Sequence, residues 1–127
     1  MNNHADSMAS IAWQLRDERP KDAQALLAAV CQANPSGVRY LRAFASVAAR
    51  NQDTETAIAA CLTAIALDGE HLETLCMLAE LYLSTMHYRQ ALEHLRRCIA
   101  LDPQMQHPAG LRARVLVKTA LKDLSAH

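Results

Sequence analysis

Residues 72–104, LETLCMLAELYLSTMHYRQALEHLRRCIALDPQ, contain two helical patterns joined by a short turn. The same pattern occurs three times in the chain, and each copy is offset from the last by 34 residues. Small, large and turn-forming residues keep a constant phase at this interval, in the series Ala23/Ala57/Ala91, Leu27/Cys61/Leu95, Val30/Ala64/Cys98, Ala33/Leu67/Leu101 and Pro35/Gly69/Pro103. A fixed period of this length predicts an array of helix–turn–helix repeats.

The composition agrees with one all-α domain. The chain has 127 residues, of which 51% are hydrophobic, only 4% are aromatic and three are glycine. Alanine and leucine, both strong helix formers, dominate. No useful length of the sequence alternates at period two, so strands are not expected.

The charge balance narrows the classes of partner. Thirteen lysines and arginines oppose thirteen aspartates and glutamates, which disfavours bulk attraction to nucleic acid or to an anionic membrane. The N-terminal sequence MNNHADSMAS lacks a basic start followed by an apolar run, so no secretory signal is visible. The longest apolar stretch, residues 25–31, is too short to span a bilayer. We therefore expect a cytoplasmic protein with no membrane span and no nucleic-acid partner.

Breaks in the pattern predict seven helices. Asn34-Pro35-Ser36-Gly37 stops the second helix, because the residue before a proline disfavours helical geometry. Asp68-Gly69 and Asp102-Pro103 end the fourth and the sixth, while Pro20 and Pro108 suit helix starts, where the missing N–H costs nothing. The expected helices span about residues 5–18, 20–33, 38–50, 53–67, 72–84, 88–101 and 108–124.

At these positions the sequence resembles the tetratricopeptide repeat family. The third unit matches the family's packing positions and closing turn at Leu75, Leu78, Ala79, Tyr82, Tyr88, Ala91, Leu95, Cys98 and Asp102-Pro103. The second unit matches at Leu41, Phe44, Ala45, Ala48, Ala57, Cys61, Ala64 and Asp68-Gly69, with Gly69 in place of the usual proline. The resemblance implies a right-handed superhelical solenoid of three repeats, about residues 5–36, 37–70 and 71–104, in a single domain over residues 1–127.

The two ends of the array need separate treatment. A strict 34-residue alignment places Ser7, Ser10 and Gln14 where the first helix should be apolar. Shortening the turn at residues 17–19 by one residue instead gives an amphipathic stripe of Met8, Ile11, Ala12 and Leu15. The last helix is expected to cap the core, since solenoid ends require a covering element. Its expected apolar stripe is Ala113, Leu116, Val117, Ala120, Leu121 and Leu124, with Arg112, Arg114, Lys118 and Lys122 facing away.

The resemblance also implies a binding surface, because in this family the first helix of each pair lines the concave side. The residues expected there are Ala9, Trp13, Arg16, Arg39, Arg42, Ala43, Ser46, Ala49, Arg50, Glu73, Cys76, Met77, Glu80 and Leu83. Arg39, Arg42 and Arg50 fit either a solvated helix face or a contact with a partner. Trp13 fits either a contact anchor or a ring that the N-terminal tail covers.

The expected residue types select among the ligands of the family. Some members grip the C-terminal carboxylate of a chaperone tail with lysines and asparagines at inner positions, and these are absent here. Alanine, methionine, cysteine and leucine beside arginines favour an amphipathic helix or an extended apolar segment instead. In length, repeat count and apolar groove the chain is similar to the short bacterial type III secretion chaperones. The alternative is a self-associating scaffold or assembly factor, with a homodimer formed through the N-terminal edge around Trp13.

Chemistry of other kinds finds no support in the sequence. The four cysteines show no CxxC pairing, and Cys61 and Cys98 occupy repeat positions otherwise filled by Leu, Ala or Val, which predicts buried thiols. His87 and His94 lack a thiol or carboxylate that would complete a ligand set. No nucleophile–base pair or phosphate-binding glycine loop is present. We therefore expect no metal, no cofactor and no enzymatic activity.

Overall fold

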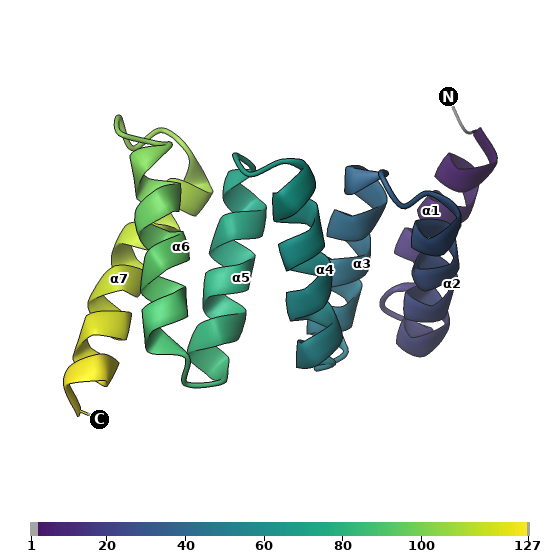
Figure 1. Cartoon of the computed structure of the whole chain (residues 1–127). Coiled ribbons are helices and arrows are strands. Elements are labelled where there is room, and N and C mark those ends of the chain that lie inside the picture. Colours follow the sequence, from purple (N-terminus) through teal and green to yellow (C-terminus); the bar gives the residue numbers. More distant parts are fainter. Residues whose placement is uncertain (1–2, 127) are drawn as a thin grey trace. The chain divides into compact units, whose positions relative to one another are not determined.

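The computed structural model describes residues 3–126, and this part of the chain is helical without strands (Figure 1). The helices are α1 (Asn3–Leu15), α2 (Pro20–Ala33), α3 (Val38–Arg50), α4 (Thr54–Leu67), α5 (Leu72–Ser84), α6 (Tyr88–Ala100) and α7 (Pro108–Ala126). The all-α prediction and the order of the helices are confirmed. The first helix was expected to reach residue 18, but it ends at Leu15 and a turn occupies residues 16–19.

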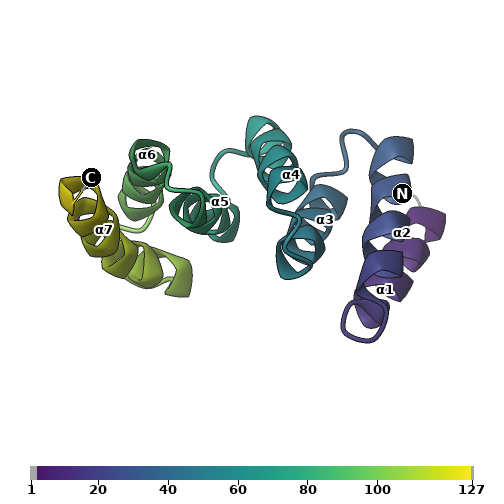
Figure 2. The same ribbon diagram turned by 90° about the horizontal axis from the view of Figure 1, so that it is seen from below.

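The helices form two compact units, one that extends to Leu67 and one that begins at Asp68. In the first unit each helix packs on the next one, and α1 also contacts α3. In the second unit α6 lies against both α5 and α7, and α7 also contacts α5 (Figure 2). The pairs α1–α2, α3–α4 and α5–α6 are therefore the helical hairpins that the 34-residue period predicts.

Each second helix buries the same three repeat positions. The residues are Ala23, Leu27 and Val30 in α2, Ala57, Cys61 and Ala64 in α4, and Ala91, Leu95 and Cys98 in α6, all at most 2% exposed. The spacing i, i+4, i+7 places them on one side of their helix. Burial raises the pKa of the Cys61 thiol to about 12 and that of the half-buried Cys31 to about 11. The thiols at these positions are therefore packing groups that stay protonated.

The turns inside the second and third hairpins share a left-handed residue. Gln52 has φ 60° and Met86 has φ 63°, and the two positions are 34 residues apart. In each turn the following residue closes the helix end, as Asp53 N–H donates to the Ala48 carbonyl (2.9 Å) and His87 N–H to the Tyr82 carbonyl (2.8 Å). These bonds form the helix ending in which a left-handed residue stands just beyond the last turn.

The first hairpin has the shifted register that the amphipathic pattern favours. Ala12 is fully buried, as are Ala45 and Ala79, the equivalent small residues of α3 and α5. Ala12 precedes Ala45 by 33 positions, one less than the period. Met8 and Leu15 pack against the core, but the prediction for Ile11 is wrong, because its side chain is 52% exposed. Its equivalent, Phe44, packs against the cluster that contains α2, and no described helix precedes α1 to cover Ile11 in that way.

The last helix buries most of the expected stripe. Ala113 and Ala120 are fully buried, and Leu116, Val117 and Leu124 are half-buried, whereas Leu121 is exposed and does not belong to the stripe. Arg114 does not face away, as expected, because its guanidinium donates to the carbonyls of Asp102 (2.6 Å) and Gly110 (3.1 Å). This tie explains its half-buried position.

A buried aspartate organises the turn before α7. Asp102 accepts hydrogen bonds from the backbone N–H groups of Gln106 (3.0 Å) and His107 (3.1 Å). These bonds and the nearby Arg114 guanidinium hold the pKa of the Asp102 carboxyl below its usual value. A Cβ at Gly110 would lie 2.0 Å from the Asp102 carboxylate, so this close approach requires glycine.

Candidate partner-binding surface

The expected binding residues fall into both units, and each set is described within its own unit. In the first unit they lie on α1 and α3, which contact one another. Ala9 and Ala43 are half-buried and pack against the core, so they contribute to the wall that α1 and α3 form more than to an open surface. Arg42, Ser46 and Ala49 are also half-buried. The side chains that reach furthest from this wall are therefore the tryptophan and the arginines.

Trp13 and Arg16 form a stacked pair at the end of α1. The guanidinium carbon of Arg16 lies 4.4 Å from the centroid of the Trp13 ring, and Arg16 Nη1 donates to the Trp13 carbonyl (2.5 Å). Trp13 is 38% exposed. The described residues 3–126 leave a substantial part of the ring open to solvent, and Arg16 holds its orientation through a cation–π contact.

Two of the expected arginines are bound by carboxylates of α1. Arg39 Nη2 lies 3.0 Å from Asp6 Oδ1, which also accepts a hydrogen bond from the Tyr40 hydroxyl (2.5 Å). This hydrogen bond raises the pKa of Tyr40. Arg50 forms an ion pair with Asp17 at the other end of the two helices. The positive charges at Arg39 and Arg50 are therefore compensated within the chain.

The sequence contained a signal for these pairs that composition alone does not give. Asp6 precedes Arg39 by 33 residues, and Asp17 precedes Arg50 by the same interval. This is the interval that relates Ala12 to Ala45, so each acid and its base hold equivalent positions on neighbouring first helices. Opposite charges at equivalent positions of adjacent parallel helices predict such an ion pair.

In the second unit the expected residues lie on α5. The prediction that Cys76 offers a binding surface is wrong, because the residue is only 4% exposed and its thiol lies 3.6 Å from Glu80 Oε1. Glu80 in turn accepts two hydrogen bonds from Arg112 of α7, one from Nε (2.5 Å) and one from Nη2 (2.9 Å). This guanidinium lowers the pKa of the Glu80 carboxyl. Met77 and Leu83 are half-buried.

Glu73 is bound by two histidines of the same unit. Its carboxylate lies 3.1 Å from His71 Nε2 and 3.0 Å from His107 Nε2. The Nδ1 atom of His107 accepts a hydrogen bond from the Ala109 N–H (3.0 Å), so Nε2 is the ring nitrogen of His107 that donates to Glu73. These contacts connect the start of α5 with the start of α7.

The remaining charged and apolar groups suggest what this surface selects. Arg39, Arg50, Glu73 and Glu80 all have oppositely charged or hydrogen-bonding partners on their own unit. The parts that offer apolar area are Trp13 in the first unit and Met77 and Leu83 in the second. Exposed, internally compensated ion pairs contribute little net attraction to a charged ligand.

A cleft that the sequence did not predict lies elsewhere on the first unit. It has a volume of about 480 Å³ and is lined by Lys21, Gln24, Ala25, Ala28, Phe44, Asn51, Asp53 and Thr56. Gln24 Nε2 donates to Asp53 (2.7 Å), and Asn51 Nδ2 donates to Gln24 Oε1 (2.8 Å). These bonds fix the start of α2 to the turn between α3 and α4, so the polar groups of the cleft have a structural role.

Two further searches concern other kinds of site. Within residues 3–126 no group of three or more His, Cys, Asp or Glu side chains is arranged to hold a metal ion. None of the described helices combines the length and the apolar character that a membrane span needs.

The hairpins and their buried small residues define the fold of tetratricopeptide repeat domains. Residues 72–105 match the family model described as tetratricopeptide repeat, which confirms the resemblance in the third hairpin. No match was found among curated proteins.

Solved structures show the same fold over nearly the whole chain. The Sgt2 tetratricopeptide domain from Aspergillus fumigatus is 16% identical, with a TM-score of 0.85 over 99% of this chain and 84% of that one. The Yersinia enterocolitica type III secretion chaperone SycD, in complex with a peptide of the translocator YopD, is 15% identical, with a TM-score of 0.81 over 99% and 95%. A type III secretion complex from Aeromonas hydrophila is 11% identical, with a TM-score of 0.89 over 100% and 87%. At these identities the likeness shows the fold.

Proposed function

We propose that the protein is an interaction module that binds a hydrophobic or amphipathic segment of another protein on the side formed by its first helices. The observation that carries this proposal is the internal pairing of the charges on these helices. Because Arg39, Arg50 and Glu80 are compensated by Asp6, Asp17 and Arg112, a partner gains little by bringing charge. Apolar contact with Trp13, Met77 and Leu83 then supplies the binding free energy.

The ligands of proteins with this fold support a peptide as the partner. SycD is solved with a peptide of YopD, PcrH with the chaperone-binding region of PopD, and the first repeat domain of RPAP3 with the HSP90 peptide SRMEEVD. The inner positions of this chain lack the lysines and asparagines that would clamp a carboxylate tail. We therefore favour a cytoplasmic chaperone of the type III secretion kind, which masks an apolar segment of a secreted subunit, over a receptor for acidic tails.

The residues proposed for the partner have different roles. Trp13 is the apolar anchor, and Arg16 holds its ring. Ser46 and the small residues Ala9, Ala43 and Ala49 form a low wall that lets a partner helix approach closely. Met77 and Leu83 supply adaptable apolar area. Arg39, Arg42, Arg50, Cys76 and Glu80 frame these groups, and the ion pairs keep the first helices in register.

A binding assay with a neutral amphipathic peptide tests the proposal. The probe is a helical peptide of about 16 residues with a leucine stripe and an uncharged polar face, a length that gives about four helical turns. Trp13→Ala and Ser46→Arg should each weaken binding by about tenfold or more, because they remove the anchor or block the wall. Thr63→Arg, on the exposed side of α4, is the matched control and should leave the affinity unchanged. Equal affinities for all four proteins would contradict the proposed surface.

A self-associating scaffold is the second candidate, and the exposure of Ile11 and Trp13 on α1 favours it. Light scattering separates the two candidates. A stable dimer that Ile11→Asp and Trp13→Ala convert into a monomer supports the scaffold. A monomer whose mass rises only when the peptide partner is added supports the binding module.

A further inference from the structure

The outer side of α7 carries a stripe of apolar and basic residues. Leu111, Val115, Lys118 and Lys122 follow the spacing i, i+4, i+7, i+11 and therefore lie in one row along the helix. All four are exposed, Leu111 by 47% and Val115 by 65%. This row is named the α7 outer stripe below.

The packing of α7 identifies it as a further first helix of the repeat array. In α3, Ala43 and Val47 pack against Ala23 and Leu27 of the preceding second helix. The turn before α7 occupies residues 101–107 and is longer than the turn before α5, residues 68–71, so the register moves to 36 residues. With that offset, Ala113 and Val117 hold the places of Ala43 and Val47, and both are buried or half-buried in α7, which packs on α6.

The same register shows what the α7 outer stripe corresponds to. Leu111, Val115 and Lys118 hold the places of Leu75, Ala79 and Tyr82 in α5. Leu75 and Ala79 are fully buried, and α5 packs closely on its second helix, α6. The stripe is therefore the side that a first helix turns toward its second helix, and no helix among residues 3–126 covers it on α7.

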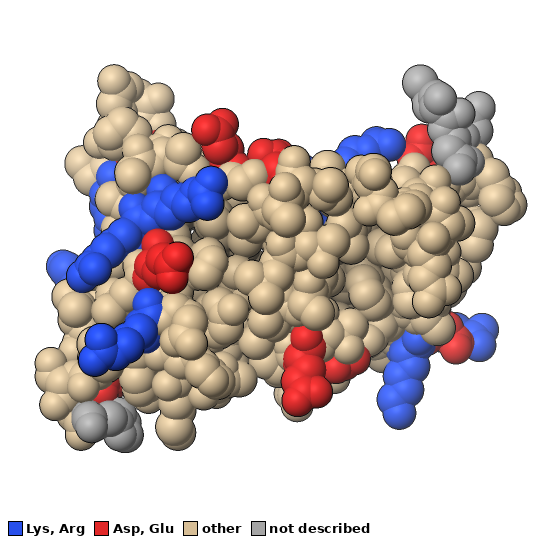
Figure 3. All heavy atoms as spheres, in the orientation of Figure 1, with Lys and Arg blue, Asp and Glu red and all other residues tan. Residues whose placement is uncertain are grey.

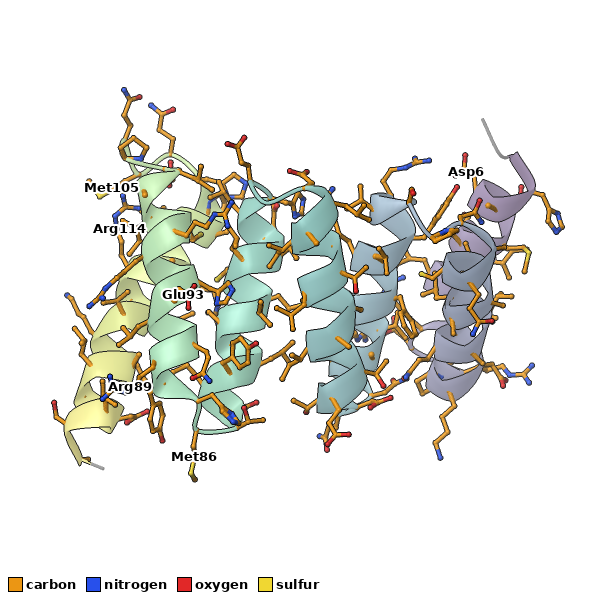
Figure 4. All side chains as sticks on the ribbon, viewed as in Figure 1. Asp6, Met86, Arg89, Glu93, Met105 and Arg114 are labelled. Atoms are coloured by element: carbon orange, nitrogen blue, oxygen red, sulfur yellow. The ribbon has the colours of Figure 1, made fainter. Side chains whose placement is uncertain are left out.

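Charge is unevenly distributed in the second unit. The helix α6 has three arginines and one glutamate, α7 has four basic residues and one aspartate, and α5 has two glutamates and no base. Basic side chains gather over α6 and α7, with Glu93 near Arg89 on α6 (Figures 3 and 4). Arg112 and Arg114 are engaged by Glu80 and Asp102, whereas Lys118 and Lys122 form no ion pair with any described side chain. The α7 outer stripe therefore combines apolar area with uncompensated positive charge.

We propose that the α7 outer stripe seats one amphipathic helix of a partner protein that carries carboxylates in its first turn. A second helix runs antiparallel to its first helix, so the partner's N-terminal turn would lie beside Lys118 and Lys122. Its later apolar turns would then pack against Leu111 and Val115. Acidic residues are favourable at a helix N-terminus, so one partner helix satisfies both requirements. This seat is separate from the first-helix surface proposed above.

The charge pattern disfavours a second copy of the chain as the occupant. In an antiparallel pair of α7 helices, Leu111 and Val115 of one copy would face Lys122 and Lys118 of the other. A parallel pair would bring lysine against lysine, and like charges in contact are destabilising.

Two segments of this chain serve as probes because both are second helices of the same length. The peptide of residues 53–68, DTETAIAACLTAIALD, has Asp53 and Glu55 in its first turn and no base. The peptide of residues 87–102, HYRQALEHLRRCIALD, has Arg89 in its first turn and is basic. Calorimetry or fluorescence anisotropy with the full chain measures both affinities. The acidic peptide should bind at least about tenfold more tightly than the basic one, a difference of about 1.4 kcal/mol.

Variants of α7 show where the acidic peptide binds. Val115→Asp, and Lys118→Glu combined with Lys122→Glu, should each weaken binding about tenfold. Leu121→Asp is the matched control, since Leu121 is equally an exposed apolar residue of α7 but lies outside the stripe. Ser46→Arg should leave this binding unchanged, which separates this seat from the first-helix surface. Circular dichroism establishes that each variant folds.

Three results would overturn the proposal. One is equal affinity for the acidic and the basic peptide. Another is a Val115→Asp effect no larger than that of Leu121→Asp. The third is displacement of the acidic peptide by a single-stranded oligonucleotide at equal concentration, which would make the stripe a general polyanion surface.

Discussion

Individual residues in the turns hold backbone conformations that their side chains do not favour. Met86 projects into solvent from the turn between α5 and α6, and Met105 from the turn before α7 (Figure 4). Both have positive φ, at 63° and 56°. A left-handed conformation costs about 1–2 kcal/mol for a residue with a Cβ, and glycine avoids this cost.

Replacing Met86 by glycine should therefore stabilise the protein, by up to about 1 kcal/mol, because the strain relieved exceeds the added entropy of the unfolded chain. Urea unfolding measures the difference. Ser84→Gly, inside the last turn of α5, is the control and should destabilise by about 1 kcal/mol, as glycine does in helices. A loss of stability in Met86→Gly as large as that in the control would show that the turn does not strain its residue.

Gly110 sits where a side chain has no room. An added methyl would approach the Asp102 carboxylate to 2.0 Å, so Gly110→Ala must displace the turn before α7. We expect a loss of about 1–3 kcal/mol in the free energy of unfolding, typical of forced overpacking. Thr119→Ala, on the exposed side of α7, should be neutral. If alanine is tolerated equally well at both positions, the close approach of Asp102 to α7 is wrong.

At the scale of elements, the turn before α7 depends on an ionised carboxylate. The bonds from Gln106 and His107 N–H and the charge of Arg114 depress the pKa of Asp102 in the folded state. A depressed pKa means that this stabilisation is complete above the unfolded value of about 3.9 and is lost as the pH falls through the folded value.

The difference in stability between the wild type and Asp102→Asn should therefore be constant above about pH 5 and should shrink as the pH falls below about 4. Urea midpoints measured across the acid range give this difference. Glu93→Gln, an exposed change on α6, should run parallel to the wild type at every pH. A difference between wild type and Asp102→Asn that is independent of pH would contradict the role of the ionised carboxylate.

Local chemistry made the helices predictable, and tertiary contacts limited the prediction of the site. The stop at Asn34-Pro35 and the proline starts at Pro20 and Pro108 depend on neighbouring residues only, so α2, α3 and α7 begin and end close to the expected positions. The exposure of Ile11 depends on the absence of a covering helix before α1, which the pattern within α1 does not reveal. Cys76 is buried because α7 packs on α5 as well as on α6, and this register follows from the longer turn before α7.

At the scale of the molecule, charge is balanced in each unit separately. Up to Leu67 six basic residues oppose six acidic ones, and from Asp68 seven oppose seven. In the first unit the pairing joins neighbouring first helices, so little of the positive charge on α3 is available to a partner. The central claim is that the first-helix side recognises apolar surface.

The salt dependence of binding tests this claim most directly. The affinity for the neutral amphipathic peptide should change less than about twofold between about 0.05 M and about 0.5 M salt, because apolar contacts are not screened whereas exposed charges are. A weakening of about tenfold or more over this range would contradict the account. It would mean that the guanidinium groups of α3 hold the partner directly.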